Sequence, residues 1–187
     1  MTLYQLIQSD YDKYKKYGGN LLGVIFLTQG FWAIFQYRIA HFFFTRVRIF
    51  GLRHFLLVFC LLWQKIIEIM TGISIPASVS IGGSFYIGHF SGIILNGKTV
   101  IGDNCNISQG VTIGFSGVGE YRGVPVIGNN VYIGANAVVA GKIVIEDNVL
   151  IGACSLVNKS VPANSIVVGV PAKVISSKGL KGSKGYI

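Results

Sequence analysis

Aliphatic residues recur at every sixth position between residues 75 and 157, apart from a two-residue slip at 99–100 and an insertion at 115–126. The positions in this register are all Ile or Val: Ile75, Ile81, Ile87, Ile93, Ile101, Ile107, Ile113, Ile127, Ile133, Val139, Ile145, Ile151 and Val157. A period of six matches neither the 3.6 of an α-helix nor the alternation of a plain strand. It is typical of a parallel β-helix, in which three hexapeptides form one triangular coil and the aliphatic side chains point inward.

The first 72 residues follow a different pattern and are predicted to be helical. Residues 21–37 are almost continuously apolar, and residues 49–70 form a second apolar stretch with a few polar interruptions. Arginines and phenylalanines are interleaved between and within these stretches: Arg38, Arg46, Arg48 and Arg53 with Phe42, Phe43, Phe44 and Phe50. The uninterrupted runs are shorter than the roughly 20 residues of a secure membrane span. We therefore expect peripheral contact with an anionic membrane surface, with burial against neighbouring subunits as the alternative.

Charge is distributed unevenly along the 187 residues. The net charge of +9 divides into +5 for residues 1–72, zero for 73–172 and +4 for 173–187. We predict an N-terminal helical region (1–72), a β-helix domain (73–175) with a loop at 115–126, and a basic flexible tail (176–187). The predicted domain is neutral and carries no nucleic-acid-binding motif, so the pI of about 9.6 does not indicate a nucleic-acid partner.

Four segments carry a family resemblance. They read Gly-Ile-Ser-Ile-Pro at 72–76, Gly-His-Phe-Ser-Gly-Ile at 88–93, Ile-Ser-Gln-Gly-Val-Thr-Ile-Gly at 107–114, and Val-Gly-Val-Pro-Ala-Lys-Val-Ile at 168–175. The chain resembles the left-handed β-helix hexapeptide acyltransferases, and most closely the serine acetyltransferase-like and polysaccharide O-acetyltransferase-like members. The resemblance implies a mainly β fold, a left-handed parallel β-helix after an N-terminal α-helical region, acetyl-CoA as co-substrate and a homotrimer. Periodicity alone does not determine the handedness.

His89 is the only histidine in the predicted β-helix, where it follows Gly88. An exposed histidine at a corner of a repeat scaffold is ordinarily a solvated turn residue. The resemblance instead implies that His89 is the general base that takes the proton of the acceptor hydroxyl, a role to which imidazole is suited near neutral pH.

The resemblance also implies where the substrates bind. The pantetheine arm of acetyl-CoA is expected along backbone of the C-terminal coils, where small residues let it approach. The implied cofactor-binding residues are Gly114, Gly134, Ala135, Gly152 and Ala153, with Lys159 and Lys173 as partners of the phosphates. The loop at 115–126 is expected to overhang the active site, with Arg122 and Asn96 as contacts of the acceptor.

Two departures from the serine acetyltransferase pattern bear on the acceptor. Gly88 stands where those enzymes have an aspartate before the histidine, and Gly123 stands where they have a second histidine. Two small residues in the acceptor pocket favour a larger, neutral acceptor. We therefore expect an O-acetyltransferase acting on a sugar hydroxyl, on a small or lipid-linked glycan, in exopolysaccharide or capsule biosynthesis. Serine O-acetyltransferase of cysteine biosynthesis and a non-catalytic β-helix scaffold are the alternatives.

No metal or disulfide is expected. Cys60, Cys105 and Cys154 show no paired spacing and are interpreted as packing residues. A γ-type carbonic anhydrase uses the same fold but needs three zinc-binding histidines, and the β-helix offers only His89. The polar, mixed-charge N-terminus does not resemble a signal peptide, which predicts a cytoplasmic location.

Overall fold

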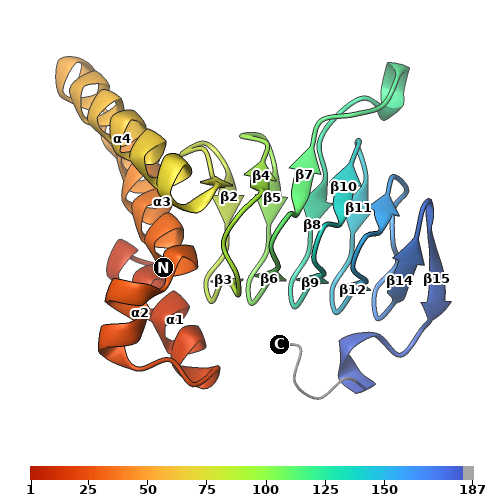
Figure 1. Ribbon diagram of the computed structural model, residues 1–187. Helices are drawn as coiled ribbons and strands as arrows, with labels where there is room; N and C mark the ends of the chain where they lie inside the picture. The colour runs from red at the N-terminus through yellow and green to blue at the C-terminus, as the bar shows by residue number, and fades with distance from the viewer. Residues whose placement is uncertain (183–187) are drawn as a thin grey trace.

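The N-terminal part of the computed structural model, which describes residues 1–182, is helical (Figure 1). Its elements are α1 (Leu3–Lys16), α2 (Leu21–Leu27), α3 (Gln29–Arg46) and α4 (Phe50–Thr71). The apolar stretch at 21–37 is not one helix, because Thr28 has an extended backbone and its hydroxyl donates to the Gly23 carbonyl at 3.0 Å. At the other end, α4 stops at Gly72, whose φ of 66° is the left-handed conformation that glycine adopts at helix C-termini.

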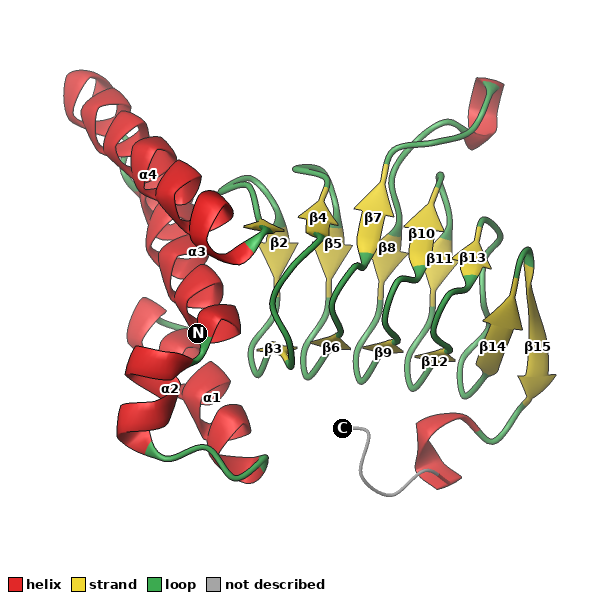
Figure 2. Ribbon diagram, viewed as in Figure 1, coloured by secondary structure: helices red, strands yellow, loops and turns green. Residues whose placement is uncertain are grey.

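The rest of the chain winds into a three-sided parallel β-helix (Figures 1 and 2). The strands are β1 (Ile73–Ser74), β2 (Ser80–Ile81), β3 (Tyr86–Ile87), β4 (Ile93–Leu95), β5 (Val100–Ile101), β6 (Asn106–Ile107), β7 (Thr112–Gly114), β8 (Val126–Ile127), β9 (Tyr132–Ile133), β10 (Val138–Ala140), β11 (Val144–Ile145), β12 (Leu150–Ile151), β13 (Leu156–Val157), β14 (Ile166–Gly169) and β15 (Ala172–Ser176). They form a five-stranded sheet (β1-β4-β7-β10-β13), a four-stranded sheet (β11-β8-β5-β2) and a six-stranded sheet (β15-β14-β12-β9-β6-β3). Each coil therefore contributes one strand to each side of the prism.

The six-residue register fills the inside of the prism. Its Ile and Val side chains are at most 6% exposed, and Ile87, Ile113 and Ile145 are completely buried. Small or apolar residues at the other inward positions, such as Val111 and Ala137, complete the core. Because a coil closes on itself, every aliphatic side chain in the register meets others from the same coil and from the coils above and below.

One corner of the prism is held by a ladder of asparagines. Asn104, Asn130, Asn148 and Asn164 all have φ between 54° and 60°, a conformation that asparagine tolerates better than most residues. Their side-chain amides donate in sequence to the carbonyl oxygen of the next, at 2.7, 3.1 and 3.2 Å. The ladder satisfies polar groups that the repeated turn brings together at each level.

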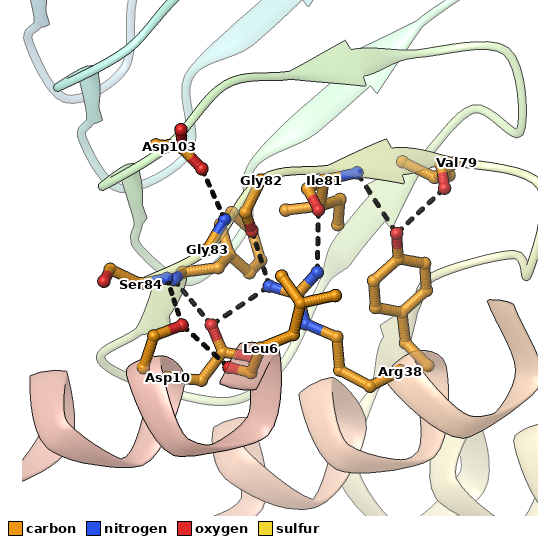
Figure 3. A network of polar contacts seen from close by, with 12 residues as sticks. Leu6, Asp10, Arg38, Val79, Ile81, Gly82, Gly83, Ser84 and Asp103 are labelled. Atoms are coloured by element: carbon orange, nitrogen blue, oxygen red, sulfur yellow. Dashed lines mark hydrogen bonds and ion pairs between the residues drawn. The ribbon is translucent and has the colours of Figure 1, made fainter. Parts of the chain in front are cut away.

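The helical region is joined to the first coil by a buried polar network (Figure 3). Arg38 of α3 pairs with Asp10 of α1 at 2.8 Å, and both side chains are at most 1% exposed. The same guanidinium donates to the carbonyls of Ile81 and Gly82 at 2.7 and 2.6 Å. Burial raises the pKa of the Asp10 carboxyl, and Arg38 opposes that shift. The carbonyls of Ile81 and Gly82 thus accept from Arg38 only while the helical region stays docked on the β-helix.

The C-terminal end closes with a hairpin rather than a further coil. β14 pairs with β12 in parallel and with β15 in antiparallel, so the chain reverses at Val170 and Pro171. A short 3-10 turn at Gly179–Gly182 then brings the Leu180 N–H to the Asn148 carbonyl at 3.3 Å. This ordered turn lies in the tail that the sequence predicts to be flexible, and residues 183–187 of that tail lie outside the described residues.

Candidate active site

His89 lies on one edge of the prism, in the turn that joins the six-stranded sheet to the five-stranded sheet. It follows β3 directly, and its imidazole is exposed, without a hydrogen bond to any other described residue. The backbone after it is tightly constrained: Ser91 has φ of 88°, and its N–H donates to the Thr71 carbonyl of α4 at 2.8 Å. The end of α4 therefore fixes the turn that presents His89.

The same edge continues through every coil toward the C-terminal end of the β-helix. We call it the His89 edge, and it consists of residues 88–92, 108–110, 134–136 and 152–154. Backbone hydrogen bonds connect its levels, from Gly110 N–H to the Ser91 carbonyl (2.9 Å), from Asn136 to Gln109 (2.9 Å) and from Cys154 to Ala135 (2.8 Å). Because strands stack about 4.8 Å apart, the edge forms a straight track leading away from His89.

Four of the cofactor residues implied by the resemblance lie on this track: Gly134, Ala135, Gly152 and Ala153. The structure gives a different reason for the two glycines. A Cβ at Gly134 would lie 2.6 Å from the Ala153 nitrogen, and one at Gly152 would lie 2.5 Å from a Val168 methyl group. Stacking of the coils therefore requires glycine at both positions, whether or not a ligand is bound. The glycines themselves are therefore not evidence of a cofactor.

The two lysines expected at the cofactor phosphates lie on different edges. Lys173 is exposed on β15, opposite Val168, beside the C-terminal end of the His89 edge. Lys159 instead follows β13 and leaves the five-stranded sheet at its far side. The structure does not bring Lys159 and Lys173 to the same edge of one chain.

We call the edge between the five-stranded and four-stranded sheets, where Lys159 lies, the second edge. Asn96 and Gly114 also lie on it. The Asn96 N–H donates to the Ile113 carbonyl at 2.8 Å, one residue before Gly114. The Asn96 side chain accepts from the Lys98 N–H at 3.0 Å, so it caps its own turn. The three residues of β4 (about 10 Å) separate Asn96 from the turn that carries His89.

The loop between β7 and β8 leaves the second edge and projects from the prism (Figure 1). Ser116 and Gly123 close its base by exchanging backbone hydrogen bonds at 3.0 and 2.9 Å. Near its base Arg122 stacks on Phe115, with its guanidinium carbon 5.1 Å from the ring centre. Arg122 is exposed, as a contact of an incoming substrate must be.

A pocket of about 590 Å³ lies between this loop and the turns that follow β10 and β13. Its lining includes Tyr121 of the loop, Asn158, and the lysines Lys142 and Lys159. No acidic residue lines it, so its charge suits an anion. Lys142 is a residue that sequence reasoning missed. The available signal was its position three residues after Val139 of the six-residue register, close to the place that Lys159 has two residues after Val157.

Gly88 and Gly123, which were expected to widen one acceptor pocket, lie on different edges. A Cβ at Gly88 would meet the flexible Tyr86 ring at 3.2 Å, so a side chain fits there after a small adjustment. A Cβ at Gly123 would lie 2.9 Å from Lys142 Cβ, so that space is already filled. The two glycines do not create a shared cavity for a large acceptor.

The environment of the cysteines only partly agrees with the packing interpretation. All three are free, and burial raises the pKa of the Cys105 thiol to about 11. Cys154, in contrast, is exposed on the His89 edge. Within residues 1–182 no group of three or more His, Cys, Asp or Glu is placed to hold a metal ion.

Comparison with known proteins extends these observations. Residues 125–159 match the family model "Bacterial transferase hexapeptide (six repeats)". A serine acetyltransferase of Staphylococcus aureus (strain Mu50) is 37% identical over 169 residues, which are 89% of this chain and 75% of that protein. A serine acetyltransferase of Synechococcus elongatus is 35% identical over 87% of this chain, but the match spans only 63% of that relative.

Solved structures agree. The crystal structure of serine acetyltransferase from Brucella abortus strain S19, in complex with coenzyme A, is 30% identical with a TM-score of 0.78, covering 95% of this chain and 67% of that one. A second crystal structure of serine acetyltransferase from the same strain has a TM-score of 0.76 at the same identity, covering 95% and 68%.

These findings correct the expected acceptor. The prediction of a sugar hydroxyl in exopolysaccharide or capsule biosynthesis is wrong, since relatives at 35–37% identity across most of the chain are serine acetyltransferases. The wrong prediction rested on Gly88 and Gly123, which lie on different edges of a single chain. The predicted fold class and acyltransferase class are confirmed. The chain belongs to the left-handed β-helix, hexapeptide-repeat acetyltransferase family, together with the serine acetyltransferases.

Proposed function

We propose that this protein transfers the acetyl group of acetyl-CoA to the hydroxyl of serine, with His89 as general base. The observation that carries the proposal is the exposed imidazole of His89 at the N-terminal end of the His89 edge, in a chain 37% identical to a serine acetyltransferase. The chain spans 63% of the length of the Synechococcus elongatus relative, and the activity is proposed for these 187 residues.

The chemistry needs one base and one positioned thioester. His89 accepts the proton of the serine hydroxyl as the oxygen attacks the thioester carbonyl carbon. The tetrahedral intermediate collapses with cleavage of the C–S bond, and the imidazolium returns the proton to the departing thiolate of coenzyme A. General base catalysis of this kind contributes about 10²–10⁴-fold, and the positioning of both substrates contributes much of the rest.

The His89 edge is the proposed track of acetyl-CoA. Ala135 and Ala153 flank this edge with small side chains, and Lys173 lies near its C-terminal end as a partner for a phosphate. Four strand spacings separate β3 from β14, or about 19 Å, which suits an extended cofactor. Gly114, Asn96, Arg122 and Lys159 lie on the second edge and reach this track only from a neighbouring subunit.

A homotrimer is therefore part of the proposal. The outer face of the four-stranded sheet supports it, because Val100, Val126 and Val144 line up in register there and are 41–48% exposed. An aligned apolar stripe on a sheet face is typical of a surface that another subunit covers. Because acetyl-CoA is the co-substrate, we expect the enzyme to act in the cytoplasm.

The test is release of coenzyme A thiol from acetyl-CoA with L-serine as acceptor. We expect turnover by the unmodified protein and a fall in kcat of about 10²–10⁴-fold in His89→Ala, with an unchanged melting temperature because His89 is exposed. His54→Ala is the matched control, since His54 is an exposed histidine on α4, outside the β-helix. Absence of serine turnover, or equal turnover in His89→Ala, would contradict the proposal.

A second variant separates the acceptor from the mechanism. Gly88→Asp restores the residue that serine acetyltransferases have before the histidine, and the structure has room for it. If serine is the acceptor, kcat/KM for serine should rise in this variant while KM for acetyl-CoA stays the same.

A further inference from the structure

The α3–α4 hairpin extends away from the β-helix, and its tip lies far from the coils (Figure 1). Only the base of the hairpin is tied down. Arg38 is held by Asp10 and the first coil, and the last turn of α4 is held through Thr71 and through Glu68, which accepts from the Ser74 hydroxyl at 2.6 Å. The hydrogen bonds of residues 42–62 stay within the hairpin, such as those from Gln36 to the Cys60 carbonyl and from Arg53 to the Phe44 carbonyl.

That outer half exposes an apolar surface without a partner. In α4 only Cys60, Gln64, Ile67 and Thr71 are buried. Large side chains on the remaining circumference are open to solvent: Phe50 (82%), Phe55 (73%), Val58 (58%), Phe59 (58%) and Leu62 (61%). A helix this rich in apolar residues is normally buried in a core or in a membrane, yet only 22% of the most apolar 18 residues of α4 are buried.

The tip of the hairpin is also purely cationic. Arg46, Arg48 and Arg53 surround it, and the chain contains no Asp or Glu between Asp12 and Glu68. Arg53 lies over the Phe44 ring at 5.4 Å and donates to the Phe44 carbonyl at 3.2 Å. Aromatic and aliphatic side chains with arginines at their margin are typical of segments that enter the headgroup region of an anionic bilayer.

We propose that the hairpin tip, residues 42–62, inserts into the surface of an anionic lipid bilayer and holds the enzyme there as a peripheral protein. A second copy of the chain is the weaker candidate, because pairing two tips brings arginines together with no acid to offset them. A membrane span is also disfavoured. Although α4 is long and apolar enough by composition, its final turns fix the turn that carries His89 and cannot leave the β-helix.

The test is co-sedimentation of the 187-residue chain with phosphatidylcholine vesicles, with and without phosphatidylglycerol. We expect binding only to vesicles that contain phosphatidylglycerol, and weaker binding as salt is added. Arg46→Gln/Arg48→Gln should reduce partitioning by roughly 30-fold. Phe55→Ser/Phe59→Ser should reduce it by about tenfold or more. Phe115→Ser is the matched control, an exposed phenylalanine on the β-helix loop, and should bind like the unmodified protein.

Three results would overturn the proposal. The first is no binding to anionic vesicles, and the second is binding that neither pair of substitutions weakens. The third is a change in oligomeric state in Phe55→Ser/Phe59→Ser, measured by size-exclusion chromatography with light scattering, while the unmodified protein does not bind vesicles. That result would assign the face to a second copy of the chain. The arginine pair is exposed and unpaired with acids, so it keeps the test valid even if the phenylalanine pair fails to fold. The result is independent of the proposed serine activity.

Discussion

The β-helix and the α3–α4 hairpin use the same kinds of aliphatic side chains with opposite results. In the β-helix, Ile87, Ile113 and Ile133 are at most 1% exposed, whereas Leu62 and Ile69 of α4 are 61% and 85% exposed. A coil of the prism encloses its own interior, so each added hexapeptide is buried by its neighbours. Two helices packed side by side cover only one stripe of each other. Apolar composition therefore produces a core only where the backbone geometry closes around it.

The joint between the two regions follows a third rule, since a buried polar network accompanies its apolar packing. Arg38, Asp10 and Lys13 are buried among backbone groups of the first coil and the asparagine ladder. Buried ionic groups are costly unless every partner is present. The intact polar network thus specifies how the helices dock, although its net contribution to stability is small.

The largest expected loss of stability comes from breaking this joint. Arg38→Met leaves the Asp10 carboxylate buried without its cation, so we expect the free energy of unfolding to fall by about 3–5 kcal/mol. Urea denaturation followed by circular dichroism measures it. The matched control is Lys65→Met, which removes the solvent-exposed pair of Lys65 with Glu68 and should change stability by less than about 1 kcal/mol. Equal losses in the two variants would contradict the view that burial makes the joint critical.

A pair of alanine substitutions sharpens the contrast between the two apolar regions. Ile133→Ala empties part of the closed prism and should lower the free energy of unfolding by about 2–5 kcal/mol. Leu62→Ala removes a side chain that faces solvent and should stay within about 0.5 kcal/mol. Both are read from urea midpoints in the absence of lipid. A large loss in Leu62→Ala would mean that the hairpin face is covered in solution.

The smallest effect is a dependence on pH at the joint. Lys13 donates to Asn104 at 2.7 Å, and burial lowers the pKa of its ammonium group to about 8. The unfolded lysine keeps its usual value near 10.4. Between these values the unfolded state therefore binds more protons, so the contribution of Lys13 to stability rises with pH from about 8 to 10.

Replacing Lys13 tests this directly. The difference in free energy of unfolding between the unmodified protein and Lys13→Met should shift in favour of the unmodified protein between pH 7.5 and pH 9.5. Lys15→Met, an exposed lysine on the same helix, should show no such shift. A difference that is constant with pH would show that Lys13 is not neutralised more easily in the folded state.

Much of the fold could be predicted from the sequence because its determinants are local. The six-residue register marks the inward side chains, and one closed coil repeats the environment of the next, so Ile133 could be assigned to the core from spacing alone. The helical region was less readable. Residues 21–37 appear continuous in hydropathy, yet Thr28 interrupts them because its hydroxyl bonds to Gly23 rather than continuing the helix.

By itself, the sequence determined the β-helix, the family and His89 as the candidate base, since each depends on short segments whose neighbours in the chain are also neighbours in space. Only the tertiary structure decided which residues share an edge. It placed Lys142 beside Lys159, separated Lys173 from Lys159, and set Gly88 apart from Gly123. The physical reason is that contacts around a coil depend on which corner each turn occupies. An insertion such as residues 115–126 keeps the register inside the prism but changes what lies outside it.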